Sequence, residues 1–207
     1  MKERLLRLKA FWEGQLGPCA IGFSGGVDSA FVLASAKRWA RVRIYPVLAV
    51  SCLLSPFAIE NAQKISKEVG IPLIRFTWQP FAIDEIARND RFRCYFCKKN
   101  MYHLLKEKVS KIDSDCHHIL DGTQFDDLFR ERPGLFALQE LGVQTPLADY
   151  GFRKTEIRSY LKEWGYSFWN IPSESCLATK LERGERLTKQ KLTALYFGLE
   201  TGKPPFC

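Results

Sequence analysis

The chain has 207 residues, 46% of them hydrophobic, which is enough for one domain with a sizeable core. Its net charge of +8 favours an anionic ligand such as a nucleotide, a phosphorylated metabolite or RNA, although scattered basic residues also suit an ordinary solvated surface. No apolar run approaches the ~20 residues of a membrane span. The charged stretch 1–8 predicts an amphipathic helix and not a signal peptide, so we expect a cytoplasmic protein with no membrane partner.

Strand-like and helix-like segments alternate along the chain. This alternation predicts an α/β fold with a doubly wound, mostly parallel sheet flanked by helices. Strands are expected at 19–23, 42–50, 72–76 and 117–120, and helices at 30–37, 55–69, 95–109, 134–141, 154–164 and 188–199, with a short helical run near 83–86. Ligands of such sheets bind outside the carboxyl ends of strands. We therefore expect residues 24–29, 51–52 and 121–123 to form one site.

The first predicted strand is joined to its helix by the stretch Phe23-Ser24-Gly25-Gly26-Val27-Asp28-Ser29. A strand that turns through two glycines into a helix N-terminus makes an anion site from free N–H groups and the helix dipole. Asp28 would repel a phosphate unless a divalent cation lay between them. The lysine-containing loop G-x-x-x-x-G-K-[ST] and the dinucleotide fingerprint are both absent. The alternative is an ordinary turn with a helix cap.

A second polar stretch follows the fourth predicted strand and contains Asp121, Asp126 and Asp127. Oxygen ligands of this kind hold Mg²⁺ and orient a ribose or phosphate. The alternative is a helix N-terminus that carries favourable acidic residues. Arg130 and Arg132 follow closely and are suited to bidentate binding of a carboxylate or phosphate.

The chain has seven cysteines, an odd number, which favours thiol chemistry or metal binding over a disulfide framework. Cys94 and Cys97 form a C-x-x-C pair among basic residues, where thiolates are stabilised. One such pair cannot complete a zinc site, which needs four ligands. The alternative to a chemical role is that both are half-buried cysteines on the first turn of a core helix. Cys176 lies in a polar loop near Lys180 and Arg183, which favours a nucleophile. Cys19 and Cys52 are expected in the core.

The Ser-Gly-Gly-x-Asp-Ser sequence after a strand resembles the pyrophosphate loop (PP-loop) of the N-type ATP pyrophosphatases. The whole set of motifs resembles one family within them, the LarE-type ATP-dependent sacrificial sulfur transferases. The matching segments are 23–29, 93–98, 121–123 with 126–127, 132–135, 140–143 with 146–147, 154–158 and 172–178. We expect a shortened member of that family, with a PP-loop domain at 1–170 and a cysteine loop with a C-terminal helix at 171–207. Lys180 replaces the arginine usual in the family.

The resemblance implies that ATP and Mg²⁺ bind, that a substrate carboxylate or carbonyl oxygen is adenylated with release of pyrophosphate, and that sulfur then displaces AMP. The implied catalytic residues are Asp28 and Cys176. The implied nucleotide-binding residues are Ser24, Gly25, Gly26, Val27, Asp28, Ser29, Ser51, Gly122 and Thr123. The implied magnesium ligands are Asp28, Asp121 and Asp127. The substrate or sulfur relay would use Arg93, Cys94, Cys97, Arg130, Arg132 and Lys180.

Several alternatives stay open at this point. Sulfur could come from Cys176 itself, leaving dehydroalanine, from a persulfide, or from a [4Fe-4S] cluster on Cys94, Cys97 and Cys176. We expect a small-molecule carboxylate substrate and a homo-oligomer. The alternatives are a tRNA-thiolation enzyme with tRNA as partner, an ammonia-dependent amide synthetase, and a non-catalytic nucleotide-binding partner of a larger complex.

Overall fold

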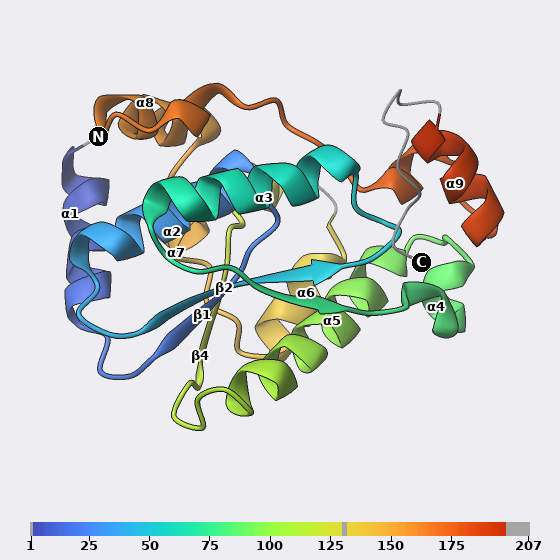
Figure 1. Ribbon diagram of the computed structural model, residues 1–207, viewed down its shortest axis with the longest axis horizontal. Coiled ribbons are helices and arrows are strands. Elements are labelled where there is room, and N and C mark those ends of the chain that lie inside the picture. Colours follow the sequence, from blue (N-terminus) through green and yellow to red (C-terminus); the bar gives the residue numbers. More distant parts are fainter. Residues whose placement is uncertain (1, 130–131, 198–207) are drawn as a thin grey trace.

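The computed structural model describes residues 2–129 and 132–197, the last two as backbone only. Its sheet has four parallel strands in the order β3-β2-β1-β4. The strands are β1 (Cys19–Gly22), β2 (Ile44–Val50), β3 (Ile74–Thr77) and β4 (His118–Asp121) (Figure 1). The predicted fold class is therefore confirmed, with the second and third strands beginning later than predicted.

The strand order reverses at β1. The chain runs from β1 to β2 and β3 on one side, and β4 then returns to the other side of β1. Gly22 ends β1 beside Val47 of β2 and Asp121 of β4. Such a switch point is where open α/β sheets bind ligands, and the loops after β1 and β4 diverge from it.

Every helix predicted from the sequence is present. The helices are α1 (Lys2–Glu13), α2 (Val27–Trp39), α3 (Pro56–Val69), α4 (Asp84–Ala87), α5 (Arg93–Ser110), α6 (Gly134–Glu140), α7 (Pro146–Asp149), α8 (Lys154–Glu163) and α9 (Lys189–Phe197), and four short 3₁₀ turns are Pro80–Ala82, Phe125–Phe129, Ser167–Asn170 and Leu177–Lys180. The short helix α7 was not predicted. The predicted end of the last helix at 199 lies outside the described residues. Helix α5 begins two residues before its predicted start at 95, which places Cys94 and Cys97 on its first two turns.

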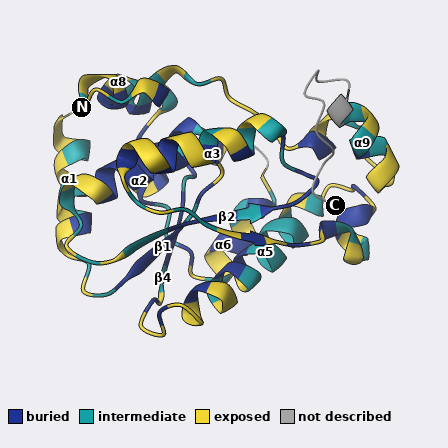
Figure 2. Cartoon of the chain, in the orientation of Figure 1, coloured by how far each residue is buried: buried dark blue, intermediate teal, exposed yellow. Residues whose placement is uncertain are grey.

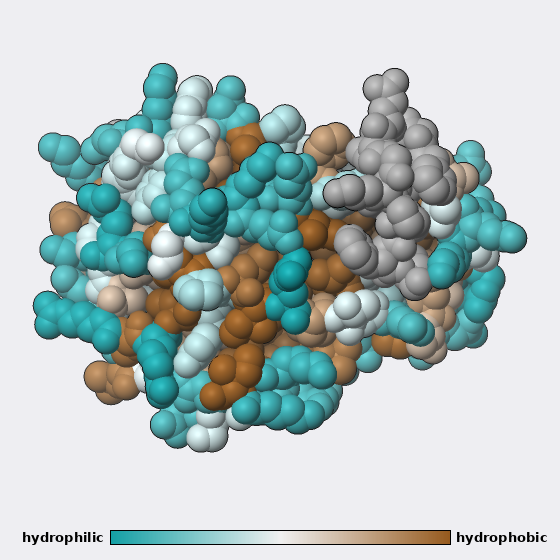
Figure 3. All heavy atoms as spheres, viewed as in Figure 1, coloured by the Kyte–Doolittle hydropathy of each residue, from teal (hydrophilic) through white to brown (hydrophobic). Residues whose placement is uncertain are grey.

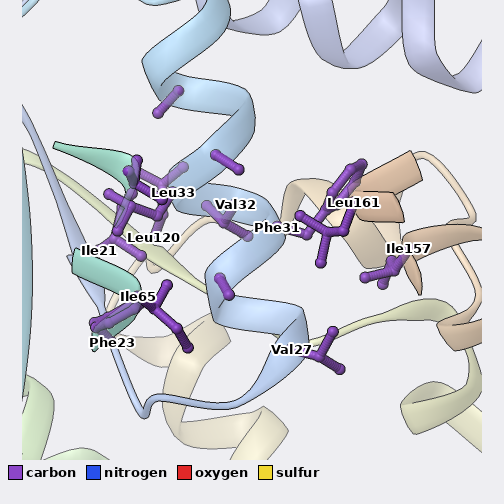
Figure 4. Close-up of a cluster of buried hydrophobic side chains, with 14 of the residues drawn as sticks. Ile21, Phe23, Val27, Phe31, Val32, Leu33, Ile65, Leu120, Ile157 and Leu161 are labelled. Carbon is purple, nitrogen blue, oxygen red and sulfur yellow. The ribbon is translucent and has the colours of Figure 1, made fainter. Parts of the chain in front are cut away.

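The central helix α2 is buried nearly all round, although the sequence predicted only an apolar face. Ile21 and Leu120 of the sheet pack on one side of α2, and Ile157 and Leu161 of α8 pack on the other (Figure 4). Phe31 of α2 also stacks on Trp164, with ring centroids 5.2 Å apart. A helix that is apolar on most sides needs cover on most sides, so α2 is packed between the sheet and α8.

Helices α5 and α6 cover the opposite face of the sheet. Their core contacts include Tyr102, Leu105 and Leu138, which pack with Ala20 and Val47 of the strands. Figure 2 shows β1 and β4 buried over most of their length, while α1, α3 and α8 expose their outer faces. The edge strand β3 has one buried residue, Phe76. Figure 3 shows hydrophobic residues in a band between α3 and α5, over the β3 side of the sheet. None of the described helices is long and apolar enough to cross a membrane.

A small third cluster fixes the C-terminal segment to the loop after β2. Cys52 and Leu53 pack there against Leu177, Ala178 and neighbouring apolar residues. The Leu177 N–H donates to the Leu53 carbonyl at 3.0 Å. The residue after Cys176 is thus held at the carboxyl end of the sheet. The domain boundary at residue 170 stays a prediction.

Candidate functional site

The PP-loop has a backbone conformation that glycine allows. Gly25 has a φ of +76°, and a β carbon there would lie 2.3 Å from the Ala58 carbonyl oxygen of α3. Gly26 is the N-cap of α2, and no side chain caps the helix. The hydroxyls of Ser24 and Ser29 lie 3.2 Å apart at the two ends of the turn. The predicted loop residues therefore converge on an open helix N-terminus, as an anion site requires.

The stretch after β4 lies directly against this helix N-terminus. A β carbon on Gly122 would be 2.7 Å from the Ser29 backbone nitrogen, so only glycine permits this approach. Thr123 donates from its backbone N–H to Asp121 Oδ1 at 2.7 Å, and its hydroxyl bonds the same oxygen. The structure thus brings together the loops that follow β1 and β4, as predicted.

Both loops line one cavity of about 260 Å³. Ser24, Gly26, Asp28, Ser29, Asp121, Gly122, Thr123, Asp127 and Arg132 line it, together with Lys98, Tyr102 and several apolar residues. Val27 is buried below the loop. The predicted residue Ser51 does not line this cavity; it is buried, and its hydroxyl accepts a hydrogen bond from the Leu53 N–H at 3.3 Å.

Asp28 is a partly buried carboxylate of the site with one oxygen lacking a hydrogen-bond partner among the described residues. Its Oδ2 lies 3.1 Å from Lys154 Nζ, whereas its buried Oδ1 has no hydrogen-bond partner within the described part of the chain. Burial raises the pKa of Asp28, Lys154 opposes the shift, and the charge of Asp127 adds to it. An orphaned buried carboxylate oxygen beside a second carboxylate fits a divalent cation.

Asp121 is instead fully satisfied by protein groups. Lys98 Nζ lies 2.7 Å from its Oδ2, which Tyr102 also bonds, and Thr123 bonds its Oδ1. Burial would raise the pKa of Asp121, but the Lys98 ammonium and these hydrogen bonds outweigh it, so the pKa is lowered. Lys98 and Tyr102 were not predicted as site residues. The sequence signals for Lys98 were its position directly after the C-x-x-C pair and its place in the matching segment 93–98.

The remaining predicted arginine and metal residues are placed as follows. Asp127 Oδ1 lies 3.0 Å from Arg132 Nη2. Arg130 lies outside the described residues. Across residues 2–129 and 132–197, no group of three or more His, Cys, Asp or Glu side chains is arranged to hold a metal ion. Each predicted magnesium ligand faces a cation of the protein, and among the residues that the structure describes only Asp28 has an oxygen without a partner.

The two cysteine segments converge, which the sequence could not show. Arg93 Nη1 donates to the Ala178 carbonyl at 3.0 Å, and its Nη2 lies 3.5 Å from Cys94 Sγ. Cys97 packs against the cluster that contains Leu177 and Ala178. Cys176 immediately precedes that pair and is exposed. Arg93 therefore clamps the C-x-x-C turn to the loop that carries Cys176.

The surroundings of Cys97 and Cys176 raise the pKa of both thiols. Burial raises the pKa of Cys97 to about 12, with further increases from Cys176 and Cys94. The protein atoms crowded around the Cys176 sulfur raise its pKa, while the Ala178 N–H and the Arg93 guanidinium oppose the shift. Cys94 is exposed. Lys180 is exposed at the end of its 3₁₀ turn. Cys19 and Cys52 are buried, as predicted.

Comparison with known proteins gives three informative relatives. An uncharacterized protein of Synechocystis, slr1717, is 31% identical over 93% of this chain and 70% of its own length. An uncharacterized protein of Methanocaldococcus jannaschii, MJ0830, is 31% identical over 83% of this chain and 64% of its own length. No protein-family model matches the chain.

The third relative has a described activity. It is the pyridinium-3,5-bisthiocarboxylic acid mononucleotide synthase of Lactiplantibacillus plantarum, 29% identical over 83% of this chain and 62% of its own length. The chain thus spans about two thirds of the length of these relatives. The PP-loop at the sheet switch point, the acidic stretch beside it and these relatives together place the chain in the LarE-type family of PP-loop sulfur transferases.

Proposed function

We propose that this chain is an enzyme that uses ATP to adenylate an oxygen of a small-molecule carboxylate, releases pyrophosphate, and then transfers sulfur to the activated carbon. The observation that carries the proposal is the meeting of the PP-loop cavity and the cysteine segments at one end of the sheet. Lys98 links them along the chain, because it lines the cavity and directly follows Cys97.

The β and γ phosphates of ATP would occupy the turn between Ser24 and Ser29. Hydroxyl groups, N–H groups of the first turn of α2 and the helix dipole stabilise negative charge at that point. Arg132 and Lys98 line the same cavity and add positive charge. Asp28 and Asp127 are the residues that would hold Mg²⁺, which supplies neutralisation of the phosphate charge. Asp121, already satisfied, would orient Lys98 and Thr123.

In the first step a carboxylate oxygen of the substrate attacks the α phosphorus. The bond from that phosphorus to the bridging oxygen breaks, pyrophosphate leaves, and an acyl-adenylate remains. The step replaces a poor leaving group, a carboxylate oxygen, with AMP.

In the second step the Cys176 thiolate attacks the acyl carbon and AMP leaves, which gives a thioester. Removal of the Cys176 α proton with cleavage of its Cβ–Sγ bond then yields a thiocarboxylate and dehydroalanine. Cys176 is exposed for attack, and the neighbouring Arg93 guanidinium opposes the rise in the pKa of its thiol. A persulfide or a [4Fe-4S] cluster on Cys94, Cys97 and Cys176 is the alternative sulfur source.

The first step is tested by incubating the protein with Mg²⁺, ATP and a panel of carboxylates while pyrophosphate is quantified. We expect release that depends on one class of carboxylate and is lost in Asp28→Ala. Asp115→Ala, which removes an exposed carboxylate in the turn before β4, should release pyrophosphate as the native protein does. Equal release by the native and Asp28→Ala proteins would exclude this site.

The sulfur source is tested by intact mass after confirmed turnover. A loss equal to one hydrogen sulfide, localised to Cys176, supports the sacrificial route. An unchanged mass favours a persulfide or a cluster, and visible absorbance of anaerobically purified protein separates these two. The tRNA-thiolation and amide-synthesis alternatives share the first step, so a thiolated tRNA or an amide product would identify them instead.

A further inference from the structure

Lys154, the first residue of α8, touches two loops that serve different steps of the proposed reaction. Its Nζ lies 3.1 Å from Asp28 Oδ2 in the PP-loop helix. The same Nζ donates to Ser173 Oγ at 3.0 Å, in the segment that leads to Cys176. One ammonium group therefore bridges the phosphate-binding end of α2 and the cysteine loop.

The rest of α8 holds that loop in place. Arg158, one turn after Lys154, donates to the carbonyls of Trp169 at 2.9 Å and Ile171 at 2.7 Å. At the start of the helix, Arg153 Nη1 donates to Asp126 Oδ1 at 2.7 Å, in the acidic stretch after β4. Lys154 is thus carried by a helix that is fixed to the nucleotide cavity and to the beginning of the cysteine loop.

The Lys154–Asp28 ion pair is suited to partner exchange. Its side chains are 34% and 22% exposed, and ion pairs that reach solvent in this way hold their partners weakly. Asp28 lines the cavity, so a polyphosphate bound there would offer Lys154 more negative charge than Asp28 does. The PP-loop also lacks the lysine that follows the last glycine in the common phosphate loop.

We propose that Lys154 is a positioning residue that exchanges Asp28 for the polyphosphate of ATP while it keeps Ser173, and so couples nucleotide binding to the position of Cys176. The inference rests on the proposed function, since it assigns ATP to the cavity. It adds an order of events: the loop with the sulfur nucleophile adopts its working position only after ATP is bound. This order would keep Cys176 from reacting before an acceptor is activated.

The test measures alkylation of Cys176 by iodoacetamide, read from its tryptic peptide, with and without Mg²⁺ and α,β-methylene-ATP, which cannot be cleaved at the α–β position. In the native protein we expect saturating nucleotide to change the labelling rate by about fivefold or more, the lower range of site-to-site coupling. Ser173→Ala should bind the nucleotide with native affinity but lose that change. Lys154→Gln should lose the change and bind nucleotide about tenfold more weakly, the effect of one charged contact.

Two further variants separate this role from a structural one. Lys154→Arg keeps the charge and should retain most of the coupling. Lys64→Gln, an exposed lysine on α3, should behave as the native protein does. Thermal melts establish that each variant is folded. A native-like nucleotide effect in Lys154→Gln or Ser173→Ala, or no effect in the native protein, would overturn the proposal.

Failure of the proposed function has a different signature. If the native protein shows the nucleotide effect on Cys176 but never releases pyrophosphate, the adenylation step is wrong and the coupling stands. If pyrophosphate is released while Lys154→Gln keeps the native labelling change, adenylation stands and the coupling is wrong.

Discussion

Gly122 and Ser29 lie in direct backbone contact, so close that a β carbon on Gly122 would stand 2.7 Å from the Ser29 nitrogen. Ser29 belongs to the first turn of α2, and Gly122 follows the last residue of β4. The contact joins the loops on either side of the switch point. It makes a single cavity out of two segments that lie far apart in the sequence.

Gly122→Ala should therefore damage both stability and nucleotide binding. Overpacking of this kind costs about 1–3 kcal/mol, because the first turn of α2 must move. Urea denaturation and calorimetric titration with Mg²⁺ and α,β-methylene-ATP would measure the two effects. Gly17→Ala is the matched control, since its nearest atom would be at an ordinary 3.6 Å. Native stability and affinity in Gly122→Ala would show that the contact is unimportant.

Asp28→Asn should stabilise the protein while abolishing activity. Burial raises the pKa of Asp28 and leaves one oxygen without a partner, so its ionised form opposes folding. Replacing a residue that destabilises the fold but is kept for function typically adds about 0.5–2 kcal/mol to the free energy of unfolding.

The gain should depend on pH. The destabilisation caused by Asp28 is absent below the ordinary carboxyl pKa of 3.8. It appears as pH rises through the raised pKa that Asp28 has in the folded protein. The native and Asp28→Asn proteins should therefore differ in denaturation near neutral pH and converge in acid. A less stable Asp28→Asn at neutral pH would show that the Lys154 pair outweighs the cost of burial.

Lys98→Met should destabilise the fold, because it removes the cation from a buried carboxylate. Loss of a charged hydrogen bond costs roughly 1.5–3 kcal/mol. The lowered pKa of Asp121 contributes stability above the ordinary pKa of 3.8, and that contribution is lost as pH falls through the lowered value. The deficit of Lys98→Met, measured by denaturation, should be largest near neutral pH.

The matched control for this variant is Lys108→Met, an exposed lysine on the same helix, which should stay close to native stability. In Asp121→Asn, the same Lys98→Met change should cost less than in the native protein. Equal costs in the two backgrounds would contradict the coupling between Lys98 and Asp121.

The cysteines of the C-x-x-C pair should react at very different rates. With a pKa of about 12, Cys97 is almost entirely a thiol near neutral pH. Its alkylation should rise about tenfold with each pH unit through the mildly alkaline range, because only the thiolate reacts. Exposed Cys94 should label much faster. Peptide mass spectrometry would measure both rates, and Cys97→Ser would confirm the assignment. Equal labelling of Cys94 and Cys97 near neutral pH would contradict the half-buried placement of Cys97.

Much of the fold was predictable because its signals are local. The glycines and serines of residues 24–29 specify a turn into a helix, and Gly70 ends α3 with a φ of +74°. The fourth strand was predicted at 117–120 from its apolar pattern and lies at 118–121. Parallel strands then bring these segments to one edge without further information.

The remaining features depend on contacts between distant residues. No local pattern places Arg93 on the Ala178 carbonyl or Lys154 on Asp28. Ser51 follows a strand in the predicted way, yet its hydroxyl turns toward the Leu53 backbone and away from the cavity. The burial of most of α2 likewise follows from α8 covering its second face. These features depend on the direction of side chains and on packing between distant segments, which a local sequence pattern does not specify.

The most direct test of the account uses a carboxylate that supports pyrophosphate release, prepared with oxygen-18 in its carboxyl group. The AMP formed in the full reaction is then analysed by mass spectrometry. Attack of the carboxylate on the α phosphorus predicts AMP that carries one oxygen-18 atom, in the native protein and not in Asp28→Ala. AMP without the label, or ADP with phosphate as the products, would contradict adenylation at this site.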